Sequence, residues 1–105
     1  MDIKDLSGLF QQAKEMHDNM AKLQSEAANI EVEGQSGGGL VRVKANGAMD
    51  LLRIDIDPSL MSSGDKEMLE DLICAAVNDA LRKSRQTLEG EMRKLTGGLN
   101  IPGMF

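Results

Sequence analysis

The chain has 105 residues, a formal net charge of -5 at pH 7, two aromatic residues and a single cysteine. This length suits one domain with a modest core of aliphatic side chains and methionines, which a second copy of the chain would enlarge. No apolar run reaches the ~18 residues that a membrane span needs, and the N-terminus lacks the pattern of a signal peptide. We therefore expect a soluble cytoplasmic protein. Nucleic-acid binders usually carry excess positive charge, so net charge alone argues against that class.

The first predicted helix covers about residues 3–29. Its apolar residues recur at alternating spacings of three and four over more than three heptads, and the residues between them are mostly polar. This heptad stripe consists of Leu6, Leu9, Ala13, Met16, Met20, Leu23, Ala27 and Ile30. So narrow a stripe fits one partner helix rather than a broad core.

Three strands are predicted next, at about residues 30–34, 40–46 and 49–57. Apolar and polar residues alternate in the second and third strands, which is typical of strands with one buried face. The apolar positions are Val41, Val43 and Ala45 in the second strand and Leu52, Ile54 and Ile56 in the third. Asn46-Gly47 is a two-residue hairpin signal, and Asp57-Pro58 ends the third strand. We expect an antiparallel meander whose apolar face is covered by a helix.

The glycines between the first two strands, in the stretch EGQSGGGLVRVKANG, raise the question of a phosphate-binding loop. A P-loop needs a lysine and a hydroxyl directly after its last glycine, and then a helix. Here Leu40 follows Gly39 and a strand pattern comes next. We interpret the glycines as a connection between strands.

The second long helix is predicted at about residues 65–96, and Gly97-Gly98 ends it before a tail at 97–105. Acidic residues begin this helix and basic residues end it, as the helix dipole favours. Its first half carries a wide apolar band suited to covering the sheet. Leu81, Leu88 and Leu95 are spaced seven apart, so the second half is expected to pair with another helix, such as the first.

The second half of this helix is locally basic. Residues 82–95 hold five cations against two carboxylates, namely Arg82, Lys83, Arg85, Arg93 and Lys94 against Glu89 and Glu91. At about 100° per residue, Arg82, Arg85 and Arg93 fall within one quarter of the circumference, where they could follow a phosphate backbone. The alternative is that late basic residues only complement the helix dipole or cover a helix contact. Lys14 and Lys22 on the first helix are weaker candidates, and Arg42, Lys44 and Arg53 fit the wet face of a sheet.

The residue types that could support catalysis or metal binding are sparse. His17 is the only histidine, and no second His or Cys lies at ligand spacing from it. Cys74 lies in the run LICAAV, where a buried apolar role is expected. Asp55 and Asp57 share a strand face, but an aspartate before a proline more often caps the following turn. We expect no catalytic site, metal site, cofactor or small-molecule substrate.

Five pieces of the chain, taken in order, carry a family resemblance. They are QQAKEMHDNMAKLQ, IEVEGQSGGGLVRVKANG, IDIDPSLM, DKEMLEDLICAAVNDALRKS and KLTGGLNIPGMF. This ordered set resembles the YbaB/EbfC nucleoid-associated proteins of bacteria. The resemblance implies an α+β chain of order α-β-β-β-α that forms a homodimer, with a small three-stranded antiparallel sheet and two long helices projecting as arms. It implies binding of double-stranded DNA, an influence on nucleoid organisation and gene expression, and no enzymatic activity.

Two functional hypotheses follow. The first is a nucleoid protein that binds duplex DNA through phosphates with weak sequence preference, using Arg82, Lys83, Arg85, Arg93 and Lys94 with Lys14 and Lys22. The second is a dimeric scaffold that binds a partner protein through its helical arms, with little or no DNA binding. The acidic net charge favours the second, as does the N-terminus MDIKDLSGLF, which lacks the glycine- and lysine-rich leader of many family members. The hypotheses differ on whether Arg82, Arg85 and Arg93 face solvent together or are neutralised by acidic residues.

Overall fold

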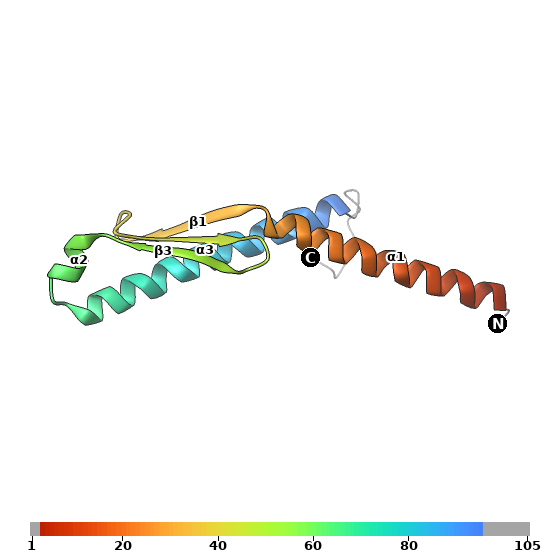
Figure 1. Cartoon of the computed structure of the whole chain (residues 1–105), viewed down its shortest axis with the longest axis horizontal. Coiled ribbons are helices and arrows are strands. Elements are labelled where there is room, and N and C mark those ends of the chain that lie inside the picture. The colour runs from red at the N-terminus through yellow and green to blue at the C-terminus, as the bar shows by residue number, and fades with distance from the viewer. Residues whose placement is uncertain (1–2, 96–105) are drawn as a thin grey trace.

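The computed structural model describes residues 3–95, which form an elongated molecule with a small sheet and two long helices (Figure 1). The elements, in chain order, are α1 (Ile3–Ala28), β1 (Glu31–Ser36), β2 (Val41–Asn46), β3 (Leu51–Ile56), α2 (Pro58–Ser62) and α3 (Lys66–Leu95). The sheet is antiparallel with the order β1-β2-β3. This confirms the α+β class and the order of the long helices and strands. Residues 1–2 and 96–105, including the expected tail, lie outside the described residues.

The core lies between β2 and α3. The side chains of Val41, Val43 and Ala45 alternate along β2 and are fully buried, as are Ala76 and Ala80 on α3. The wide apolar band of the first half of α3 packs on the same cluster through Leu69, Leu72, Ile73 and Val77. The alternation of β2 and the band on α3 were therefore interpreted correctly.

Small residues bring α3 unusually close to β1. Gly34 on β1 lies against the turn of α3 between Ala76 and Ala80, and a Cβ atom at Gly34 would stand 2.6 Å from the carbonyl oxygen of Ala76. Only glycine fits such an approach, because the atoms in the way belong to the backbone. This contact sets the distance between α3 and the sheet at β1.

The predictions for the two hairpin connections had different outcomes. Gly37, Gly38 and Gly39 all have positive φ and join β1 to β2, which confirms their interpretation as a connection between strands. The two-residue turn predicted at Asn46-Gly47 was wrong. The hairpin is closed by a hydrogen bond from the Asn46 N–H to the carbonyl oxygen of Asp50, so three residues lie between the bonded pair. Among them, Met49 has the positive φ, of 68°.

Gly47 packs against α1 and α3, which explains why the left-handed residue of the turn is Met49 instead. Its N–H donates to the carbonyl oxygen of Ala27 at 2.9 Å, and a Cβ atom at Gly47 would meet that oxygen at 2.7 Å and Thr87 at 3.0 Å. Gly47 is thus required where the end of α1, the hairpin and α3 meet. Met49, rather than Gly47, therefore adopts the left-handed conformation of the turn.

The expectation that a helix covers the whole apolar face of the sheet was wrong for β3. Because α3 lies over β1 and β2, Leu52 and Ile54 on β3 remain 49% and 44% exposed. Leu51 and Met49, beside them in the chain, are also exposed.

The expected pairing of the long helices occurs over a short stretch only. Leu23 and Ala27 are the buried positions of the heptad stripe within the described residues, whereas Leu6, Leu9, Met16 and Met20 are exposed. The reason is that α1 projects well past the end of α3 (Figure 1). On α3, Leu81 and Leu88 are half-buried. The side chain of Leu95 lies outside the described part of the chain.

A short helix, α2, was not predicted. Its first residue is Pro58, and its cap is Asp57, whose carboxylate accepts a hydrogen bond from the Ser59 N–H at 2.9 Å. An N-cap aspartate followed by proline at the first helical position is a recognised helix start, so the signal was present in the sequence. The expected capping role of Asp57 is confirmed.

Candidate nucleic-acid interface

The arginines of the predicted stripe are all exposed on one side of α3. Its packing face carries Ala76, Ala80 and Ser84, spaced one turn apart and fully buried. Helical periodicity places Arg82, Arg85 and Arg93 on the opposite side, and each of them is exposed. These three arginines are called the arginine stripe below. The same periodicity puts Glu89, also exposed, one turn from both Arg85 and Arg93.

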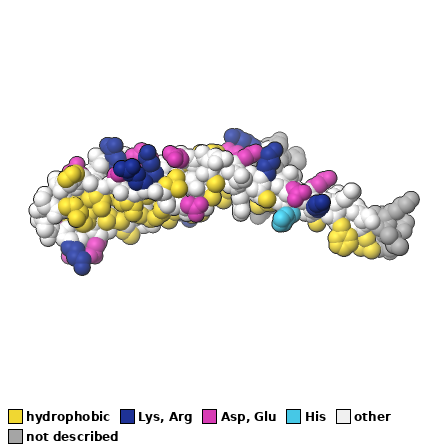
Figure 2. All heavy atoms as spheres, viewed as in Figure 1, with side chains coloured by type: hydrophobic (Ala, Val, Ile, Leu, Met, Phe, Trp, Pro, Cys, Tyr) yellow, Lys and Arg dark blue, Asp and Glu magenta, His cyan; other side chains and the backbone are white. Residues whose placement is uncertain are grey.

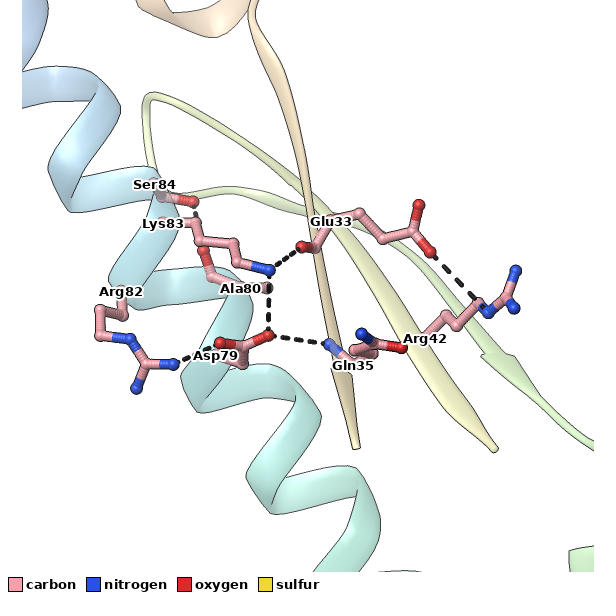
Figure 3. Close-up of polar contacts among 8 residues, drawn as sticks. All are labelled: Glu33, Gln35, Arg42, Asp79, Ala80, Arg82, Lys83 and Ser84. Carbon is pink, nitrogen blue, oxygen red and sulfur yellow. Dashed lines mark hydrogen bonds and ion pairs between the residues drawn. The ribbon is translucent and has the colours of Figure 1, made fainter. Parts of the chain in front are cut away.

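A carboxylate just before the basic stretch at residues 82–95 neutralises part of this region (Figure 3). Asp79 pairs with Arg82 one turn later, and its Oδ2 atom lies 3.2 Å from Lys83 Nζ. Lys83 also donates to the backbone carbonyl of Glu33 at 2.8 Å, which ties it to β1. The spacings i, i+3 and i, i+4 were visible in the sequence and could have revealed both pairs.

The Asp79 carboxylate has a lowered pKa. The main cause is the hydrogen bond from the Gln35 backbone N–H at 3.0 Å, followed by the hydrogen bond from Lys83. Both donors favour the charged form. Asp79 therefore remains an anion at neutral pH, and with it residues 79–95 hold five cations against three carboxylates.

The remaining candidates divide into paired and unpaired cations. Lys94 pairs with Glu91 at 3.1 Å and Lys22 with Glu26 at 3.9 Å. These two pairs and Asn19 line a groove between α1 and the end of α3. Within residues 3–95, Arg85 and Lys14 are exposed and form no ion pair. Of the seven candidate cations, five lie along the second half of α3, as predicted, and the two weaker candidates lie on α1: Lys22 across the groove and Lys14 on the projecting part.

The cations on the sheet lie among acids. Arg53 pairs with Asp55 at 2.7 Å, and Arg42 lies 3.9 Å from Glu33. Figure 2 likewise shows basic and acidic side chains interleaved along the visible face, without a continuous basic surface. The outer face of the sheet is thus electrically mixed, as expected for a solvated face.

The residues considered for catalysis or metal binding do not assemble into a site. His17 is 85% exposed on α1, beside Asp18. Cys74 is exposed, so the expectation that it is buried was wrong: it lies off the packing face defined by Ala76 and Ala80. No three His, Cys, Asp or Glu side chains come together as metal ligands among the described residues. No helix in residues 3–95 is long and apolar enough to cross a membrane.

Comparison with known proteins decides the family. The family model described as the YbaB/EbfC DNA-binding family matches residues 2–99, nearly the whole chain. The chain belongs to the YbaB/EbfC family. This bacterial family consists of nucleoid-associated DNA-binding proteins and is not a family of enzymes. The fold is also similar to that of an uncharacterized protein, HP0035 from Helicobacter pylori, whose crystal structure aligns with a TM-score of 0.72 and 28% sequence identity over 92% of this chain and 99% of the other.

Proposed function

We propose that this YbaB/EbfC protein binds duplex DNA as a homodimer, through phosphate contacts with weak sequence preference, and so affects nucleoid organisation and gene expression in the cytoplasm of a bacterium. Membership of a DNA-binding family supports the ligand class. The observation that carries the mode of binding is the arginine stripe, because it places three permanently charged guanidinium groups on the solvent face of one helix.

The geometry of the stripe suits a phosphate backbone. From Arg82 to Arg93 the helix rises ~16 Å, a length over which duplex DNA presents several phosphates. Guanidinium groups bind phosphate oxygens in pairs of hydrogen bonds without reading the bases. Phe10 is the one aromatic residue of the described chain, so stacking on unpaired bases has little support. Duplex DNA is therefore favoured over single strands.

The exposed apolar surface on the β3 side of the sheet supports the homodimer. We call it the β3 surface: Met49, Leu51, Leu52 and Ile54, all exposed. The flank of α3 that contacts β1 is the one with Asp79 and Lys83. Helical periodicity puts the half-buried Leu81 and the exposed Cys74 on the other flank, away from β1. Figure 2 shows hydrophobic side chains gathered over the half of the molecule that holds the sheet. A second copy on the β3 surface would remove this area from water and present the arginine stripe twice.

The first experiment removes the arginine stripe. The triple variant Arg82→Gln, Arg85→Gln, Arg93→Gln should bind a random-sequence duplex at least tenfold more weakly than wild type in fluorescence anisotropy at low salt. A matched triple variant, Lys44→Gln, Arg53→Gln, Lys66→Gln, loses the same charge elsewhere and should bind nearly as well as wild type. Equal losses in both variants would contradict a site on α3.

The second experiment tests the dimer. Ile54→Lys puts a charge in the centre of the β3 surface, where burial without a partner is costly. Light scattering should then give the mass of a monomer with unchanged helical circular dichroism. Leu9→Lys, at an equally exposed apolar position on α1, should leave the dimer intact. A monomeric wild type, or a dimeric Ile54→Lys protein, would refute the assignment of this surface.

A partner-protein scaffold is the second candidate, and one observation favours it. The exposed part of the heptad stripe offers another helix an apolar contact surface. A folded dimer that fails to bind duplex DNA at low salt would make this the better account.

A further inference from the structure

The exposed part of the heptad stripe is the most apolar feature of the projecting arm. Leu6, Leu9 and Met20 are exposed along it, and Met16 is 69% exposed; Phe10, one turn from Leu6 at the edge of the stripe, is 72% exposed. These side chains follow one another over about four turns of α1. An apolar stripe of this length is normally covered by something.

The course of the chain shows what lies within reach of this stripe. α3 runs antiparallel to α1 (Figure 1). It ends beside α1, where Glu91 and Lys94 line a groove with Asn19 and Lys22. The chain therefore leaves α3 next to the point where the buried part of the stripe, at Leu23, gives way to the exposed part at Met20. Beyond that point α1 continues without α3 (Figure 1).

The length and composition of the following segment match the stripe. Residues 96–105 read TGGLNIPGMF and contain no charged residue and four large apolar ones: Leu99, Ile101, Met104 and Phe105. Ten extended residues span up to ~33 Å, whereas the distance along α1 from Met20 to Leu6 is ~21 Å. Gly97 and Gly98 provide the freedom to turn onto α1 directly after α3.

We propose that residues 99–105 dock on the exposed heptad stripe of the α1 helix in their own chain. The tail is tethered beside the stripe, at an effective concentration in the millimolar range, so it competes well against a second molecule in dilute solution. The docked tail covers the apolar arm and keeps α1 from associating with other copies or proteins. This inference is independent of DNA binding.

Docking of the tail can be tested by NMR, because the chain has only two aromatic residues, Phe10 and Phe105. In a Phe10→Leu variant, Phe105 is the one aromatic residue left in the chain, and two of the eight methionines, Met16 and Met20, lie on the stripe. With labelled methionine methyl groups, NMR should show NOEs from the Phe105 ring to the methyl groups of Met16 or Met20. Absence of both NOEs overturns the proposal.

A mixed sample separates the two possible sources of the tail. Half the chains carry labelled methionine methyl groups and deuterated phenylalanine, and the other half carry protonated phenylalanine only. Docking within one chain predicts that the NOEs vanish in this mixture. NOEs that persist at about half their strength would show that the tail comes from a second copy, which overturns docking within the chain.

Hydrogen exchange gives an independent readout in the full chain. The variant Leu99→Ser, Ile101→Ser, Phe105→Ser keeps the length of the tail and removes its apolar side chains. Amides of residues 9–20 should exchange several-fold faster in this variant than in wild type, while amides of β2 remain unchanged. Equal exchange of residues 9–20 in both proteins would contradict docking.

Discussion

The backbone N–H of Gln35 on β1 donates a hydrogen bond of 3.0 Å to the carboxylate of Asp79 on α3. The same carboxylate pairs with Arg82 and Lys83. One side chain therefore both joins the middle of α3 to the sheet and neutralises two of the cations from which the DNA contact is proposed. Its removal should affect stability and DNA binding in opposite directions.

Asp79 predicts an acid-sensitive part of the stability. Its pKa is lowered below the ordinary value of 3.8, chiefly by the Gln35 N–H. A carboxylate of this kind stabilises the fold above its unfolded pKa, and the stabilisation is lost as pH falls through its folded pKa. Asp79→Asn should have a lower Tm than wild type at neutral pH, and the difference should shrink below about pH 4. A difference that is constant from pH 7 to pH 2.5 in melts followed by circular dichroism would contradict this.

The same substitution should strengthen DNA binding. Asp79→Asn frees Arg82 and Lys83 and raises the local charge by one, so we expect several-fold tighter binding to duplex DNA at low salt. Asp71→Asn is the matched control: it removes one charge from an exposed position of α3 remote from the arginine stripe. Equal effects of the two variants in anisotropy titrations would mean that only net charge matters.

Gly34 and Gly90 should respond in opposite ways to a methyl group. Gly34→Ala pushes a Cβ atom into the backbone of α3 and should lower the free energy of unfolding by about 2–3 kcal/mol. Gly90 lies inside α3 with nothing within 4 Å of an added Cβ atom, so Gly90→Ala should raise it by about 0.5–1 kcal/mol. Urea denaturation measures both. A mild effect at Gly34 would show that α3 can move away from β1.

The substitution Met49→Gly should stabilise the fold slightly. Its φ of 68° is a left-handed conformation that costs a residue with a side chain ~1 kcal/mol relative to glycine. Because the Met49 side chain is exposed, little packing is lost in a monomer. Met49→Gly should therefore raise the free energy of unfolding by up to ~1 kcal/mol at concentrations that keep the chain monomeric. A clear loss there would show that the methionine side chain contributes more to packing than its exposure indicates.

Periodic patterns predicted the elements of this fold but not how far each is covered. The alternation of Val41, Val43 and Ala45 identified β2, because a strand buried on one face imposes that pattern. The heptad stripe identified α1, yet periodicity alone does not say where a partner helix ends, and the structure buries Leu23 and Ala27 while Met16 is exposed.

The candidate site was predictable in part. Helical spacing correctly placed Arg82, Arg85 and Arg93 together, because it depends only on the geometry of one helix. The hydrogen bond of Asp79 to Gln35 was not predictable, since it depends on how α3 crosses β1. Likewise, the second role of Gly47 depends on a contact with Ala27 that no local turn pattern contains.

The most direct test of the account is a titration of the purified wild-type protein into a labelled random-sequence duplex by fluorescence anisotropy, at several salt concentrations. Binding through phosphates predicts that the logarithm of the binding constant falls linearly with the logarithm of salt concentration, by ~0.9 for each phosphate neutralised. A slope of several units would support the arginine stripe presented twice in a dimer. Binding that does not change with salt, or no binding at low salt by a well-folded protein, would contradict it.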